Sequence, residues 1–120
     1  TNTASDGNLD ILGRYWYNGG SNYLSDLVNG GTAPAGAYLA NNWGLYDMHG
    51  NIWEWCLDWY GAYVGDATDP NGAATGSDRV LRGGSWGRDA DFSRSAYRAY
   101  TSPVSASYVI GFRLSLPTGL

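Results

Sequence analysis

Lysine and glutamine are absent from the chain, and cysteine occurs once, as Cys56. With one cysteine no disulfide can form within the chain, so its stability has to come from packing or from a bound metal ion. Charged residues make up 15% of the 120 residues, and the formal net charge is -4. Nucleic acid is therefore a poor partner, because its binding relies on a basic protein surface.

Long apolar segments are also missing. No segment approaches the roughly 20 apolar residues that a membrane-spanning helix requires, and no signal-peptide or lipidation motif is present. We therefore expect no membrane insertion. The chain also begins without methionine, which suggests a processed protein or an excised domain.

Glycine and aromatic residues are abundant, with 18 Gly, 10 Tyr and 6 Trp. This composition favours a loop-rich fold with bulky buried anchors over a helical bundle. The length predicts one domain, residues 1–120, around one core. Alternating aromatic residues predict a strand over 52–58, apolar residues flanked by arginine predict another over 79–82, and a third is predicted over 110–114. One short helix is expected near Ser25 to Val28.

Three blocks of sequence then follow in order. They read GLYDMHGNIWEW from Gly44, RVLRGGSW from Arg79 and GFR from Gly111. Together they closely resemble the formylglycine-generating enzyme, or sulfatase-modifying factor, family. The resemblance covers residues 36–116 well and the first 35 only loosely. Family members are about twice this long, and we therefore expect that an N-terminal half of the usual domain is missing or abbreviated. It implies an α+β, C-type-lectin-like fold that is loop-rich, with short antiparallel strands and little helix.

The resemblance also indicates what the chain has lost. Family enzymes carry two copper-binding cysteines shortly after the Gly-Gly-Ser block, and the matching positions here are Arg88 and Ser93. Neither side chain is a ligand for a cuprous ion, so we expect no copper, no catalytic residues and no enzyme activity. Cys56 is interpreted as a buried filler. His49, the only histidine, is interpreted as a surface or hydrogen-bonded residue, and it cannot supply the several ligands of related iron enzymes.

Calcium is the metal that the resemblance suggests. It places a structural site in the loop at Asp47 to Glu54, with carboxylate oxygens from Asp47 and Glu54 and carbonyl oxygens from Gly50 and Ile52. A hard cation takes six to eight such oxygens. The alternative is an ordinary turn in which Asp47 acts as a cap and Glu54 pairs with an arginine. Both interpretations are open at this point.

Residues 87–109 resemble the diversified segment in the variable proteins of diversity-generating retroelements. The similarity lies in the preceding Gly-Gly-Ser-Trp, the central RSAYR from Arg94 and the closing IGFR from Ile110. Lys, Glu, Gln, Met and Trp, which adenine-directed mutation of asparagine codons cannot produce, are absent between Gly87 and Val109. The segment is rich in Tyr, Ser and Gly, as antibody paratopes are, and a long aperiodic loop in a small domain is commonly functional.

We therefore expect a ligand-binding surface within 87–109. Its predicted contact residues are Gly87, Arg88, Asp89, Asp91, Phe92, Tyr97, Ala99, Tyr100, Thr101, Ser102, Ser105, Ser107 and Tyr108. Arg88 is the arginine expected to meet ligand, while five others are expected to pair with acids and carbonyls in the scaffold. These are Arg79, Arg82, Arg94, Arg98 and Arg113.

The sequence thus predicts a non-enzymatic binding module for a protein or cell-surface ligand. The resemblance favours a cell surface or a phage particle as its location. Two alternatives remain: an oxidase relative of the formylglycine-generating type, and an inactive or structural domain of that family. The sequence carries no indication of the oligomeric state.

Overall fold

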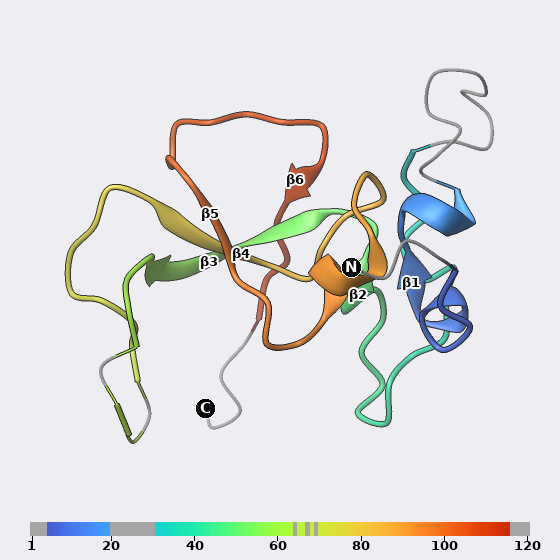
Figure 1. The fold of residues 1–120 in the computed structure, drawn as a ribbon, viewed down its shortest axis with the longest axis horizontal. Helices are drawn as coiled ribbons and strands as arrows, with labels where there is room; N and C mark the ends of the chain where they lie inside the picture. Colours follow the sequence, from blue (N-terminus) through green and yellow to red (C-terminus); the bar gives the residue numbers. More distant parts are fainter. Residues whose placement is uncertain (1–4, 20–30, 64, 67, 69, 116–120) are drawn as a thin grey trace.

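The computed structural model describes residues 5–19, 31–63, 65–66, 68 and 70–115. Regular elements are short, and loops join them (Figure 1). In chain order they are the 3-10 helix η1 (Leu9–Ile11), β1 (Gly13–Arg14), η2 (Trp16–Asn18), β2 (His49–Gly50), β3 (Trp53–Trp59), β4 (Arg79–Arg82), η3 (Ala90–Ser93), β5 (Ala99–Thr101) and β6 (Ile110–Gly111). The predicted helix near Ser25 lies outside the described residues. Within them, no helix is long and apolar enough to cross a membrane.

A four-stranded sheet with the order β5-β4-β3-β6 forms the centre of the molecule. Strand β4 is antiparallel to both β3 and β5, as the fold class predicts, whereas β6 runs parallel to β3. The connection from β5 to β6 arches away from the sheet before it returns beyond β3 (Figure 1). A second, two-stranded sheet pairs β1 with β2 in parallel.

The strands agree closely with the sequence-based expectations. Strand β4 covers the predicted 79–82, and β3 begins and ends one residue later than predicted. Asn51, two residues before β3, has a φ of 65°, so the chain is still turning there. Strand β6 ends at Gly111 instead of Leu114. After it, the Arg113 guanidinium pairs with Glu54, where further strand pairing is replaced by a side-chain contact.

Buried side chains come from the sheet and from the loops beside it. Trp53, Val80, Leu81 and Trp86 are each no more than 5% exposed. The N-terminal part adds a smaller cluster around Tyr15, which is fully buried. Its hydroxyl group accepts a hydrogen bond from the Asp6 amide at 2.7 Å and donates one to Asp10 Oδ1 at 2.8 Å. Burial raises the pKa of Tyr15 above its ordinary value.

The Gly-Gly-Ser block turns the chain sharply from β4 toward η3. Gly83 and Gly84 have φ angles of 91° and 82°, in the region that favours glycine. A Cβ atom on Gly84 would lie 2.5 Å from Ser93 Oγ, so only glycine allows η3 to pack this closely. The Gly83 carbonyl also accepts a hydrogen bond from the Gly50 amide at 2.6 Å. The block therefore joins the sheet, the β1–β2 pair and the start of segment 87–109.

Candidate ligand-binding surface

The predicted ligand segment, 87–109, runs from the end of the buried Gly-Gly-Ser-Trp block through η3 and β5 to the start of β6. Its two most exposed predicted aromatic residues are Tyr100, 55% exposed, and Tyr108, 71% exposed. Arg88, Ser105 and Ser107 are also exposed. The structure therefore presents polar and tyrosine side chains from this segment to solvent, while the buried Trp86 and β6 hold its two ends.

Two other predicted contact residues connect this surface to the core. The rings of Phe92 and Tyr97 have centroids 4.9 Å apart, and Tyr97 lies 5.9 Å from the ring of Trp53. Both are half-buried, so they support the surface as well as contributing to it. The remaining predicted residues are half-buried too: Gly87, Asp89, Asp91, Ala99, Thr101 and Ser102.

Tyrosines outside the predicted segment lie against it. The ring of Tyr60, one residue after β3, is 4.1 Å from the ring of Tyr100. The Arg98 guanidinium lies 4.8 Å from the ring of Tyr60 and 4.0 Å from that of Tyr63, and it donates a 2.8 Å hydrogen bond to the Gly61 carbonyl. Sequence reasoning missed Tyr60 and Tyr63. Two tyrosines directly after an aromatic-rich strand were the available signal.

Two of the arginines that the sequence assigned to the scaffold, Arg82 and Arg79, donate hydrogen bonds to backbone carbonyls. Arg82 donates hydrogen bonds at 3.0 Å to the carbonyls of Ser95 and Tyr97. Arg79 stacks 3.5 Å over the ring of Trp59 and bonds the Leu57 carbonyl. Guanidinium donors directed at fixed carbonyls hold loops in place. Arg88, by contrast, is exposed and lies 5.4 Å over the ring of Phe92.

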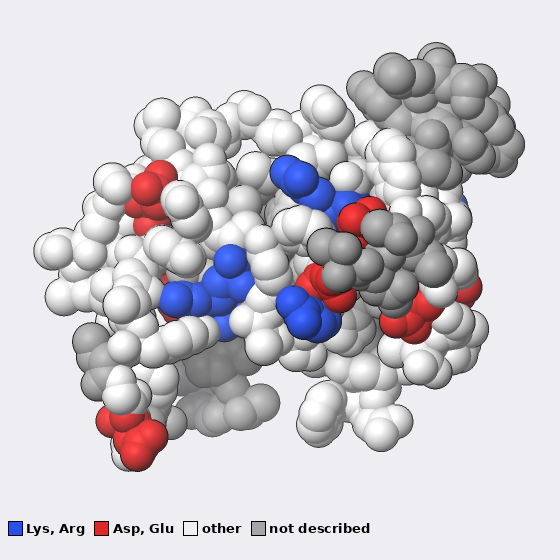
Figure 2. All heavy atoms as spheres, in the orientation of Figure 1, with Lys and Arg blue, Asp and Glu red and all other residues white. Residues whose placement is uncertain are grey.

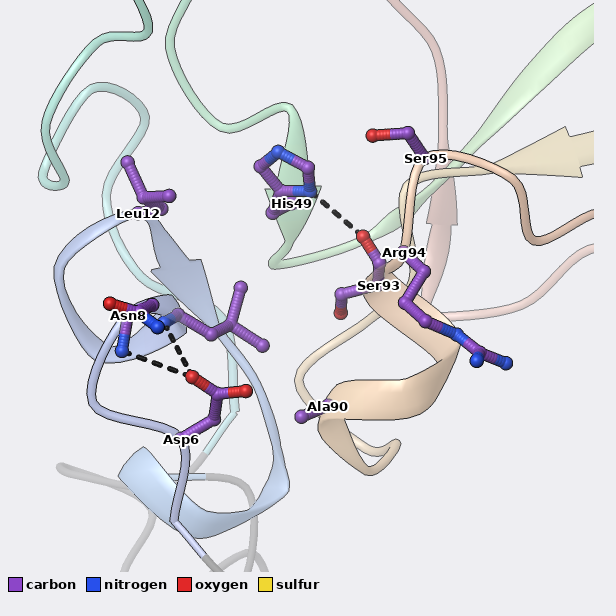
Figure 3. Close-up of a pocket in the computed structure, with 9 residues that line it drawn as sticks. Asp6, Asn8, Leu12, His49, Ala90, Ser93, Arg94 and Ser95 are labelled. Atoms are coloured by element: carbon purple, nitrogen blue, oxygen red, sulfur yellow. Dashed lines mark hydrogen bonds between the residues drawn. The ribbon is translucent and has the colours of Figure 1, made fainter. Parts of the chain in front are cut away.

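A hollow of about 330 Å³ lies between the N-terminal part, β2 and η3 (Figure 3). Asp6 and Arg94 are on opposite walls, and Asp6 Oδ1 accepts hydrogen bonds from the amides of Asn8 and Leu9. Ser93 is 2% exposed, and its Oγ atom has no hydrogen-bond partner among the residues that the structure describes. The Arg94 guanidinium extends away from Asp6 (Figure 3).

The two positions that the sequence resemblance matched to the family cysteines differ in environment. Arg88 is exposed, whereas Ser93 is buried. The lone thiol, Cys56, lies half-buried in β3, where burial raises its pKa and the charge of Asp58 adds to the increase. A raised pKa lowers the thiolate fraction and with it the reactivity. His49 Nδ1 lies 2.8 Å from the Ser93 carbonyl oxygen, so His49 is hydrogen-bonded, as predicted.

In the predicted calcium loop, the positively charged group is the Arg113 side chain. The Arg113 guanidinium donates to both carboxylate oxygens of Glu54, at 2.6 and 2.5 Å, and to the carbonyls of Tyr46 and Asp47, at 2.9 and 3.0 Å. Its hydrogen bond to Glu54 raises the pKa of Arg113 above its ordinary value. Asp47 Oδ2 accepts a 2.7 Å hydrogen bond from the Gly36 amide, while the buried Oδ1 atom has no partner within the described part of the chain.

These contacts bear directly on whether the residues fit calcium. Glu54 is paired with an arginine, as in the alternative interpretation, and the part of the chain that the structure describes holds no group of three or more His, Cys, Asp or Glu residues suited to a metal. The unpartnered Asp47 Oδ1 is nevertheless a hard oxygen of the class that calcium takes. The set of Asp47, Gly50, Ile52 and Glu54 therefore stays a prediction.

Substituting Arg113 by alanine is expected to lower the free energy of unfolding by about 1–2 kcal/mol. Two charge-assisted bonds and two carbonyl bonds are lost, but the side chain is 37% exposed and solvent screens the ion pair. Urea denaturation followed by tryptophan fluorescence measures the change. Arg88→Ala, which removes an exposed arginine, is the control, and equal stability of the two variants would show that the Glu54 pair contributes nothing.

Over most of its length, this chain matches known proteins in sequence and in fold. A model of the sulfatase-modifying factor enzyme 1-like domain matches residues 3–116. The formylglycine-generating enzyme of Streptomyces coelicolor is 42% identical over 88 residues, covering 68% of this chain and 28% of that protein. The inactive C-alpha-formylglycine-generating enzyme 2 of Mus musculus is 39% identical over 95 residues, covering 74% of this chain and 27% of that one.

A solved structure extends the similarity to the tertiary level. Treponema denticola variable protein 1 superposes with a TM-score of 0.74 at 37% identity, over 92% of this chain and 37% of that one. The chain thus spans about a third or less of each of these proteins. The loop-rich, C-type-lectin-like fold class and the resemblance to a variable protein are confirmed. This chain belongs to the sulfatase-modifying factor (formylglycine-generating enzyme) family.

Proposed function

We propose that this chain is a non-enzymatic ligand-binding module of the retroelement-diversified type, with its ligand surface in residues 87–109. The observation that carries the proposal is the placement of this segment. Its ends are held by the buried Trp86 and by β6, while Tyr100 and Tyr108 face solvent. The similarity to Treponema denticola variable protein 1 supports the same function. Side chains on such a segment can change without loss of the scaffold.

A protein or another cell-surface structure is the proposed partner, and a cell surface or a phage particle is the proposed location. Exposed tyrosines surrounded by serines are typical of protein-binding surfaces, because tyrosine offers a large rigid contact area at low entropic cost. The net charge of -4 argues against nucleic acid.

A structural calcium ion at Asp47, Gly50, Ile52 and Glu54 is part of the proposal. Loss of thermal stability in EGTA, restored by calcium and not by magnesium, is the test of that ion.

The alternative function is oxidation of a peptide cysteine, which the family resemblance implies, and several relatives are named formylglycine-generating enzymes. Arg88 and Ser93 at the cysteine positions argue against it, since a copper-binding thiol pair is lacking. The family also includes a mouse protein named inactive. Incubating the chain with copper and a cysteine-containing peptide, followed by mass spectrometry, distinguishes these functions. Formation of formylglycine above the copper-only control would overturn the binding-module proposal.

Replacing both Tyr100 and Tyr108 by serine is expected to weaken partner binding at least about tenfold and to leave the fold intact. Two exposed anchors are removed, while the core residues beneath them remain. The partner for this measurement is a peptide selected from a displayed library on the wild-type chain. Binding is measured by surface plasmon resonance and folding by near-UV circular dichroism.

Trp43→Ser is the matched control, because Trp43 is 84% exposed but lies outside the segment. If Trp43→Ser weakens binding as much as the double tyrosine variant, residues 87–109 are not the ligand surface. Deep sequencing of the gene in its source population gives an independent check. Variation confined to codons 87–109 supports a diversified surface, whereas equal variation over 36–86 contradicts it.

A further inference from the structure

A second hollow, of about 350 Å³, opens beside the predicted ligand segment. It is lined by Tyr60, Arg94, Ala96, Tyr97 and Arg98. Four of these come from the RSAYR block, and Tyr60 comes from the loop after β3. Two arginines and two tyrosines thus surround one space, and none of the acidic residues that the structure describes lines it. Figure 2 shows basic side chains in the middle of the same face, over β5 and η3.

Both guanidinium groups are oriented by the protein and keep unused donors. Arg94 Nε donates to the Asp91 carbonyl at 2.9 Å, and Arg98 Nη2 donates to the Gly61 carbonyl at 2.8 Å. Tyr60 and Tyr63 also hold the Arg98 guanidinium by ring contacts. Across the described residues, neither arginine forms an ion pair with a carboxylate. The remaining N–H groups are therefore available to a ligand. Because the side chains are already oriented, less conformational entropy is lost when a ligand binds.

We propose that this hollow is a constant carboxylate-binding subsite, in which Arg94 and Arg98 receive an Asp or Glu side chain of the protein partner. The inference rests on the proposed function and assigns a chemistry to its partner. Guanidinium groups bind carboxylates through paired, charge-assisted hydrogen bonds. The volume is at the lower end of small-molecule sites and suits one side chain better than a whole ligand.

The position of the subsite explains how specificity could vary around a fixed anchor. Arg94 and Arg98 belong to the scaffold arginines, whereas the neighbouring Tyr97 and Tyr100 belong to the predicted contact set. Tyr100 stacks on Tyr60 at the side of the hollow. Exchange of the tyrosines then changes which partner fits, while the acidic anchor stays the same. Such a division keeps part of the binding energy through every round of variation.

Fluorescence anisotropy with a labelled pentaglutamate peptide at low ionic strength tests the subsite. Pentaglutamate is expected to bind the wild-type chain at least about fivefold more tightly than pentaglutamine does. Arg94→Gln should remove most of this difference, because it deletes the cation and keeps a side chain of similar length. Arg94→Lys should restore part of it, since the charge returns without the paired geometry. Arg79→Gln, an equal charge change at a residue outside both the hollow and segment 87–109, should change binding less than about twofold.

Arg98→Gln is the second variant, with near-UV circular dichroism to confirm that its loop contacts are kept. Equal affinities for pentaglutamate and pentaglutamine overturn the proposal, and so does unchanged pentaglutamate binding by Arg94→Gln. A phosphoserine peptide that binds while pentaglutamate does not would overturn the carboxylate assignment. In each of these cases, tyrosine-dependent binding of the library-selected peptide separates a failed subsite from a failed ligand surface.

Discussion

Replacing Gly50 by alanine is expected to lower the free energy of unfolding by more than about 3 kcal/mol. A Cβ atom at this position would lie 2.1 Å from the Arg14 carbonyl oxygen, and the φ angle is 75°. The clash is with backbone, so β1 has to move away from β2, and the hydrogen bond from the Gly50 amide to Gly83 is strained as well. Thermal and urea denaturation measure the loss.

Gly44→Ala separates the two causes. Gly44 has the same φ of 75°, but nothing lies within 4 Å of a Cβ atom there. Its variant therefore reports the cost of the left-handed conformation alone, about 1–2 kcal/mol. The difference between the two variants measures the clash. Equal losses of unfolding free energy in the two variants would mean that β1 can move away from β2 without further loss, and that the β1–β2 pair contributes little to stability.

Truncating Trp53 to alanine is expected to lower the free energy of unfolding by about 3–5 kcal/mol. Trp53 is 5% exposed, and its removal leaves a cavity in the centre of the sheet. Its ring also packs on Tyr97, which lines the proposed carboxylate subsite. We therefore expect weaker pentaglutamate binding even where the variant is folded. Urea denaturation gives the stability, and anisotropy on the folded fraction gives the binding.

Trp43→Ala provides the comparison for Trp53, because the same side chain is removed from an exposed position. A change within about 0.5 kcal/mol is expected for it. A large loss for Trp43→Ala, or a small one for Trp53→Ala, would contradict the assignment of the core. The pair of variants also shows whether tryptophan fluorescence follows global unfolding or a local change.

Strand positions were predictable where residue pattern and pairing agree. The alternating aromatic residues of β3 and the apolar pair of β4 placed both strands to within one residue. The parallel direction of β6 was not predictable, because a short apolar segment carries no information about which strand it joins. Its pairing with β3, through Trp53 and Ile110, depends on the path of the β5–β6 connection.

For the candidate surface, too, some features were predictable from the sequence and others were not. The motifs identified 87–109 as the segment of interest, and the buried and exposed residues within it could not be separated by type alone: Tyr97 packs on Trp53 while Tyr100 faces solvent. The contributions of Tyr60 and Tyr63 were missed because they lie outside the segment. They reach it only because β3 and β5 are both neighbours of β4 in one sheet.

The sequence by itself determined the family, the loop-rich fold class, the three strand-forming blocks and the absence of a copper-binding cysteine pair. Each is encoded locally, in motif order, residue type or spacing. Only the tertiary structure decided that Arg113 pairs with Glu54, and that Tyr60 and Arg98 join Arg94 around one hollow. These contacts join residues up to 59 positions apart, and they depend on strand order and loop path, which local pattern does not encode.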